Sequence, residues 1–150
     1  MSDPLRPAVM GILNVTPDSF SDGGVHFDHP KAIHSALQME EDGASIVDVG
    51  GESTRPGSNA VSDDEEMARV IPVIDAIRRR SGIPISIDTR KAKVAEAALD
   101  AGANIINDVS ALRHDPAMRT LAATRNVPVI LMHMRGEPRT MQENIVYSEV

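Results

Sequence analysis

Short apolar runs alternate along the chain with longer segments of helical pattern. Five runs consist mostly of β-branched or other aliphatic residues: 9–13, 45–49, 83–87, 104–106 and 127–132. Their apolar positions are nearly continuous and do not alternate with polar ones, which is typical of strands covered on both faces. The pattern therefore predicts five strands of a parallel sheet.

The segments between these runs predict helices. Four are expected: from near Pro30 to Gly43, from Ser62, from Lys91 to Gly102, and from Asp115-Pro116. Proline suits an opening helical turn, glycine suits the residue after a helix, and Ser62 with Glu65 forms a capping box. Pro72 lies inside the second segment, and we expect a kink or a break just before it.

Strands that alternate with helices in this way predict an α/β fold with a parallel sheet. A polar group follows each apolar run: Asn14, Asp48 with Gly50-Gly51, Asp88, Asn107-Asp108, and His133. Taken singly, each of these residues is explained as a cap of the next helix or turn. Because the carboxyl ends of parallel strands meet on one face of the fold, we expect the five together to line one pocket.

The connection after the first run distinguishes a closed barrel from an open sheet. This stretch, NVTPDSFSDGG, lacks the GxGxxG spacing of a dinucleotide-binding turn. We therefore predict a TIM (β/α)8 barrel. Since eight such units normally take about 250 residues, residues 1–150 are expected to be the N-terminal portion of one longer domain, supplying roughly its first five βα units.

Composition narrows the class of protein further. The chain has 150 residues, 41% of them hydrophobic, no cysteine and a formal net charge of −7. A negative chain whose one dense basic run is Arg78-Arg79-Arg80 is not expected to bind nucleic acid, and that run is interpreted as the basic end of a helix. No disulfide is possible, no segment suggests a signal or a membrane span, and we expect a cytoplasmic protein.

Two connections are longer than usual for a βα unit, namely 14–24 and 50–59. Long ordered loops are more often binding loops than filler, although simple mobility explains either one alone. His26, His29 and His34 with Asp28 have irregular spacing, and we interpret them as surface residues and not as a metal cluster. His133 fits either a site contact or a buried, hydrogen-bonded histidine.

Five motifs carry a resemblance. In order along the chain they are NVTPDSFSDGG, VDVGGESTRPGS, SIDT, NIINDVS and LMHMRG, and together they resemble the dihydropteroate synthase family. The resemblance implies a pterin-binding TIM barrel and a transferase of folate biosynthesis that is a sulfonamide target. Such an enzyme joins 6-hydroxymethyl-7,8-dihydropterin diphosphate to 4-aminobenzoate, with Mg2+ present, and releases diphosphate. A homodimer is also implied.

The resemblance assigns roles to individual residues. Those matched to pterin contacts are Asp88, Asn107 and Met132, and Asn14 is matched to the position near Mg2+ and the diphosphate. Those matched to the diphosphate and aminobenzoate region are Asp48, Thr54, Arg55, Pro56, Ser19 and Phe20, where Phe20 of the first loop helps to wall the aminobenzoate pocket. Asp22, Arg55 and Asp88 are the expected catalytic residues.

The residue types agree with that chemistry. A pterin presents a row of hydrogen-bond donors, which a buried carboxylate and an amide can satisfy, and a matched site rejects analogues that lack those groups. Asp22 and Asp88 would stabilise positive charge on the pterin methylene, while Arg55 and Mg2+ would neutralise the departing diphosphate.

Two alternative functions remain at this point. A pterin-dependent methyltransferase domain would share the Asp and Asn contacts but not the two long loop motifs. A noncatalytic paralogue would keep the fold for binding or assembly. The family's later site residues, a further Asp, a Lys, an Arg and a His, are not among these 150 residues, so the chain by itself is expected to be inactive.

Overall fold

The structure is a computed structural model that describes residues 7–16, 29–53 and 60–133. Five strands alternate with four helices. The strands are β1 (Met10–Asn14), β2 (Ile46–Gly50), β3 (Ile85–Asp88), β4 (Ile105–Asp108) and β5 (Val129–Leu131). The helices are α2 (His29–Glu41), α3 (Asp63–Arg78), α4 (Ala92–Asp100) and α5 (Ala117–Arg125).

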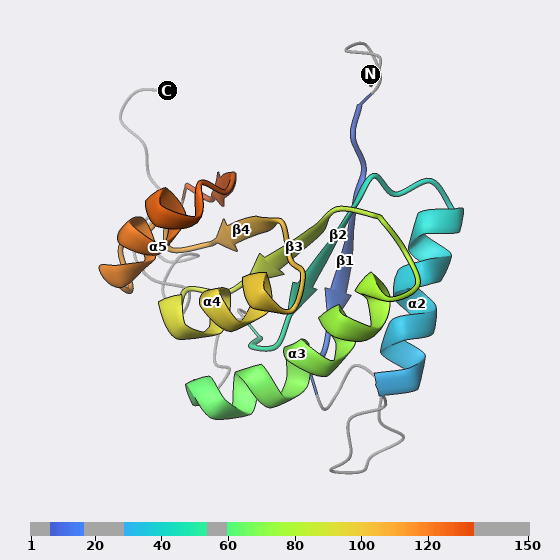
Figure 1. Ribbon diagram of the computed structural model, residues 1–150, viewed down its shortest axis with the longest axis horizontal. Coiled ribbons are helices and arrows are strands. Elements are labelled where there is room, and N and C mark those ends of the chain that lie inside the picture. The colour runs from blue at the N-terminus through green and yellow to red at the C-terminus, as the bar shows by residue number, and fades with distance from the viewer. Residues whose placement is uncertain (1–6, 17–28, 54–59, 134–150) are drawn as a thin grey trace, which may run out of the picture.

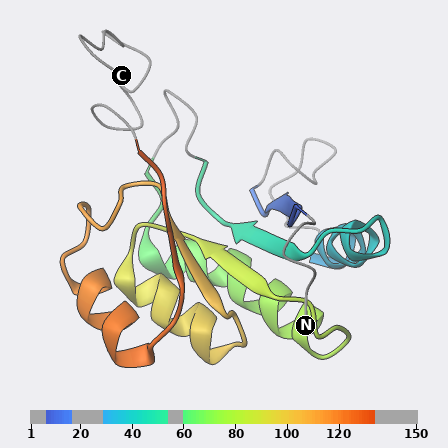
Figure 2. The same ribbon diagram turned by 90° about the horizontal axis from the view of Figure 1, so that it is seen from above.

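All five strands are parallel and stand in sequence order, β1-β2-β3-β4-β5. The four helices follow one another along one face of the sheet, as Figures 1 and 2 show. A doubly wound open sheet would reverse its strand order and carry helices on both faces. Strands that advance in one direction, with every described helix outside, follow the course of a (β/α)8 barrel, so the predicted fold class is confirmed.

The two faces of the sheet differ in character because successive side chains on a strand point to opposite sides. Core residues on the helix side are at most 1% exposed: Leu13, Val47, Val49, Ile85, Ile87 and Ile106. The alternate positions include Asn14, Asp48, Asp88 and Asn107, which therefore lie on the face that no described helix covers. This face corresponds to the interior of a barrel.

Helix α3 begins as predicted and continues further than predicted. The hydroxyl of Ser62 accepts a hydrogen bond from the backbone N–H of Glu65 at 3.2 Å, which confirms the N-terminal cap. The helix then continues through Pro72, so of the expected kink or break, the break does not occur. Pro72 lies on the exposed side, where water can bond the carbonyl that loses its partner, while Val73 and Ile74 are fully buried beneath it.

The loops at the amino-terminal ends of β3 and β4 are joined by one arginine. Arg78 Nε and Nη2 both donate to the carbonyl of Gly102, at 3.1 and 2.9 Å. Its other nitrogen contacts are the carbonyl of Ser81 and Oδ1 of Asn104, which also accepts from the N–H of Ile85. Arg78 thus stabilises the end of the sheet opposite the polar strand ends.

The predicted strands are all present, with ends shifted by one or two residues from the apolar runs. Helix α5 begins at Ala117, one residue later than expected, yet Oδ1 of Asp115 still accepts from the N–H of Ala117 at 2.9 Å. Within the described residues, no helix is both long enough and apolar enough to span a membrane.

Candidate active site

The carboxyl ends of four strands bring polar side chains to one level of the uncovered face. The strand register pairs Asn14 with Gly50, Gly50 with Asp88, and Asp88 with Asn107. Because paired residues of neighbouring parallel strands point to the same side, Asp88 and Asn107 lie next to each other. Asn14 is on the same face, one strand beyond Gly50.

Asp48 lies one layer deeper and is joined to this row. The side-chain amide of Asn107 donates to Oδ2 of Asp48 at 3.0 Å, and Asp48 is only 3% exposed. Burial raises the pKa of Asp48, while the neighbouring Ser86 and Asn107 act in the opposite direction. Oδ1 of Asp48 and Oγ of Ser86 are buried without a hydrogen-bond partner among the described residues. These two atoms can therefore form further hydrogen bonds.

Asp88 has the most strongly shifted carboxyl group of the site. Burial, followed by the negative charge of Asp48 and then those of Glu66, Asp108 and Glu52, raises its pKa to about 7. A partly buried carboxyl with such a pKa changes charge near neutral pH and gains from a ligand that presents hydrogen-bond donors. Asp88 is therefore suited to recognise a donor-rich ligand.

Gly50 leaves room beside Asp88. A Cβ atom built on Gly50 would stand 3.4 Å from both Cβ and Oδ2 of Asp88, so any real side chain would begin in contact with that carboxyl group. With glycine at this position, β2 contributes only backbone between Asn14 and Asp88. The strand ends can thus hold a flat group across β2.

Asp108 does not line the pocket as expected, because it faces the helix side. It is fully buried, and its carboxylate accepts from the N–H groups of Ser110 at 2.7 Å and Leu112 at 3.0 Å. Ala111 and Leu112 both have positive φ angles, of 54° and 61°. Asp108 therefore supports a strained loop after β4, a conformation usually kept where function requires it.

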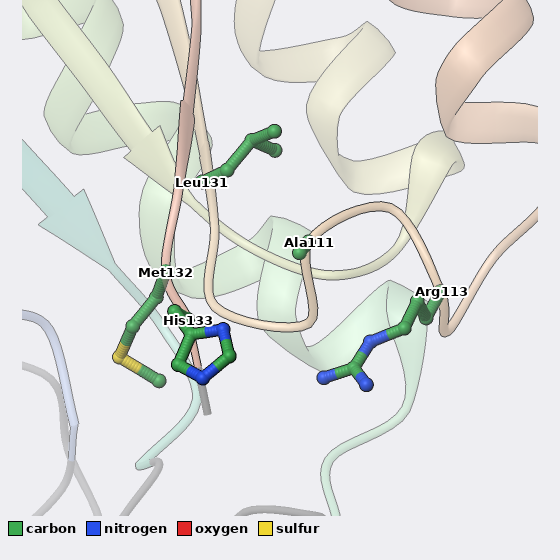
Figure 3. Close-up of a pocket in the computed structure, with 5 residues that line it drawn as sticks. All are labelled: Ala111, Arg113, Leu131, Met132 and His133. Carbon is green, nitrogen blue, oxygen red and sulfur yellow. The ribbon is translucent and has the colours of Figure 1, made fainter. Parts of the chain in front are cut away.

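That loop borders a cavity of about 340 Å³ at the end of β5. Figure 3 shows its lining, which comprises Ala111, Arg113, Leu131, Met132 and His133. The guanidinium of Arg113 and the ring of His133 face each other across the cavity, while Met132 points away from Arg113. Met132 follows Ile130, the partner of Asn107, by two positions and so belongs to the uncovered face.

Six of the predicted site residues lie outside the described part of the chain: Ser19, Phe20, Asp22, Thr54, Arg55 and Pro56. His26 and Asp28 lie outside it too. Among the described residues, no three His, Asp or Glu side chains are grouped so that they could hold a metal ion. Asn14 is exposed at the end of β1 and offers one neutral oxygen.

Sequence reasoning missed a group of charged residues just beyond the carboxyl ends of β2 and β3. The buried charges of Glu52, Glu66 and Lys91 form ion pairs between the end of β2, α3 and the start of α4. Their separations along the chain are large, and no local pattern relates them. The acidic residue in GGEST and the basic residues in DTRK were the available signals.

Residues 10–150 match the sequence profile of a family described as pterin binding enzyme. The chain belongs to this family. The family assignment agrees with the resemblance seen in the motifs, which is thereby confirmed.

Individual relatives are similar to this chain over most of its length. The dihydropteroate synthase of Bacillus subtilis is 60% identical over 132 residues, which are 88% of this chain and 46% of the relative. A dihydropteroate synthase of Yersinia pestis, solved with a sulfonamide drug complex, has a TM-score of 0.87 at 49% identity and covers 96% of this chain and 52% of its own. The dihydropteroate synthase of Xanthomonas albilineans, solved with 4-aminobenzoic acid, has a TM-score of 0.81 at 52% identity. This match covers 88% of the present chain and 49% of the Xanthomonas chain. The chain spans about half the length of such relatives.

Proposed function

We propose that the protein containing this chain is a dihydropteroate synthase. It would condense 6-hydroxymethyl-7,8-dihydropterin diphosphate with 4-aminobenzoate to give 7,8-dihydropteroate and diphosphate. The observation that carries the proposal is the convergence of Asn14, Asp48, Asp88 and Asn107 on one uncovered face of the sheet. Family membership and the names of the relatives support the same reading.

Pterin recognition is assigned to Asp88 and Asn107. The ring system presents its amino group and a ring N–H as donors, which an ionised carboxylate accepts, while an amide can both donate and accept. Donors placed at Asp88 favour its charged form, so binding of the pterin would lower the pKa that burial has raised. Met132, on the same face, would provide an apolar contact with the ring.

The bond changes follow from the substrates. The C–O bond between the pterin methylene and the diphosphate breaks, and its electron pair leaves with the diphosphate. The amine nitrogen of 4-aminobenzoate forms the new C–N bond and then loses a proton to solvent. Asp88 and Asp22 would stabilise the positive charge that develops on the methylene, and Arg55 would offset the negative charge of the diphosphate.

Mg2+ would bind at this site together with the diphosphate. Mg2+ usually keeps several waters and takes one or two protein oxygens together with substrate phosphates. Asn14, which is exposed at the end of β1, would supply one such oxygen from its amide. Bound there, Mg2+ would help to neutralise the leaving group. Asp48 is buried below this region and would orient Asn107.

The remaining assignments come from the resemblance. Phe20 and Ser19 would wall the aminobenzoate side, Thr54 and Pro56 would lie around the diphosphate and aminobenzoate, and the enzyme would act in the cytoplasm as a homodimer. Phe20→Ala is expected to raise the KM for 4-aminobenzoate much more than the KM for the pterin diphosphate. Equal increases for both substrates would contradict this role.

The proposal is tested with the full-length protein by measuring dihydropteroate formed from the two substrates with Mg2+ present. Asn107→Ala should weaken binding of 6-hydroxymethylpterin, followed by calorimetry, about 10- to 100-fold, because it removes hydrogen bonds in a partly buried site. Gln38→Ala is the control, since Gln38 is an exposed residue of helix α2 whose amide bonds only to Asp42 among the contacts described. Absence of both pterin binding and product in the wild type would refute the function.

A further inference from the structure

A buried lysine joins the two ends of the connection between β2 and α3. The ammonium group of Lys91 lies 2.8 Å from Oε2 of Glu52, just after β2, and 2.5 Å from the carbonyl oxygen of Val61, just before α3. It also lies 2.6 Å from Oε2 of Glu66, on the first turns of α3. An ammonium has three N–H donors, and these three oxygens take all of them.

The backbone that carries Lys91 is fixed on both sides. Its N–H donates to the hydroxyl of Thr89 at 3.2 Å, and Thr89 is itself bonded through its N–H to the carbonyl of Asn107. The next N–H, that of Ala92, donates to Oδ2 of Asp115 at 2.8 Å. The lysine side chain therefore extends from a point held by the end of β4 and by the segment just before α5.

The carboxylate partners of Lys91 are deeply buried. The side chain of Glu66 is fully buried, that of Glu52 is 10% exposed and that of Lys91 is 12% exposed. Arg90 adds a second cation to Glu52 at 2.8 Å. Charged groups with so little access to water attract each other strongly, and this attraction depends closely on their geometry. The contact is thus a specific one, unlike an exposed ion pair.

The position of this contact relates it to the site. Glu52 follows Gly50 by two residues, Lys91 follows Asp88 by three, and Gly50 and Asp88 are partners in the sheet. We propose that Lys91 is a positioning residue: by holding Glu52 and Val61 together, it fixes both ends of the β2–α3 connection at the rim of the site. The inference rests on the proposed function, under which this connection serves the diphosphate and aminobenzoate.

A purely structural role for Lys91 makes a different prediction. If Lys91 only compensates the buried charge of Glu66, then removing both charges should restore normal function. If Lys91 positions the connection, the double variant Lys91→Met with Glu66→Gln should fold and still fail, because Glu52 and Val61 have lost their common partner. The double variant also avoids the unpaired buried carboxylate that could prevent the single variant Lys91→Met from folding.

The experiment compares this double variant with wild type in the full-length protein. The expected result is a rise of about tenfold or more in the KM for 4-aminobenzoate, as small displacements of positioning groups have large effects. At pH 8, above the pKa of Asp88, the dissociation constant of 6-hydroxymethylpterin, which lacks the diphosphate, should stay within about twofold, because Asp88 is then ionised with or without the charge of Glu66. Hydrogen exchange of the backbone amides at 51–53 and 60–62 should accelerate at least about tenfold.

The matched control is Lys93→Met with Asp64→Asn. This pair also links α4 to α3, at 2.9 Å, but its side chains are 60% and 82% exposed, so no readout should change. Unchanged exchange at the two ends, or equal losses for both ligands, would overturn the role of Lys91. A wild type without pterin binding or turnover would refute the proposed function instead, and the exchange measurement would still decide the role of Lys91.

Discussion

Replacing Asp88 with asparagine should stabilise the fold at neutral and basic pH. Burial and the neighbouring carboxylates raise the pKa of Asp88 from 3.8 to about 7. Between these two values the folded state holds a proton that the unfolded state releases, so stability falls as pH rises through this range. Between pH 5 and pH 8, the unfolding free energy of the wild type should fall by about 2 to 3 kcal/mol relative to that of Asp88→Asn.

The assay is urea unfolding of wild type and Asp88→Asn at pH 5 and pH 8. Other groups that titrate in this range contribute equally to both proteins, and the difference between the two isolates Asp88 and its coupling to Asp48. Asp100→Asn removes the same charge from an exposed position and serves as control. If the unfolding free energies of wild type and Asp88→Asn differ by the same amount at both pH values, then Asp88 does not titrate in this range and the reasoning is refuted.

Three further outcomes are expected. Arg78→Met should lower the unfolding free energy by about 2 kcal/mol in urea titrations because it leaves loop carbonyls unpaired, whereas Arg79→Met, in an exposed pair, should change it by less than about 0.5 kcal/mol. Gly51→Ala places a Cβ 2.8 Å from Cγ1 of Val70 and should lower the unfolding free energy by about 1 to 3 kcal/mol. The Cβ added in Gly82→Ala would have no atom within 4 Å, so the unfolding free energy should hardly change. In calorimetry, the affinity for 6-hydroxymethylpterin should fall about tenfold per pH unit below the pKa of Asp88, since a protonated carboxyl accepts fewer hydrogen bonds, and a flat profile would contradict its role.

The order and type of the elements could be predicted because local patterns determine them. Continuous apolar runs, the capping box at Ser62 and the terminal glycine at Gly43 are signals contained within a few residues. That the helix would continue through Pro72 could not be predicted, because the tolerance of a proline depends on the side of the helix that it faces. That side is fixed by packing of Val73 and Ile74, which is tertiary information.

The candidate site could be predicted only in outline. Parallel strands bring their carboxyl ends together, so Asp88 and Asn107 were correctly expected on one edge. Asn107 and Asp108 are consecutive and must face opposite sides, but the run of apolar residues does not reveal which one faces the pocket. Lys91 was missed because its partners are 25 to 39 positions away and meet only in the folded chain.

Under the proposed function, Gly50 has a consequence for how inhibitor-tolerant variants could arise. At its position β2 offers only main-chain atoms, and every substitution adds atoms beside Asp88 without removing any. A side chain there would then restrict a bound pterin and a pterin-like inhibitor alike. We therefore expect tolerance to arise at other residues around the site, so that the main chain at Gly50 is a suitable contact for compounds designed to lie flat across β2.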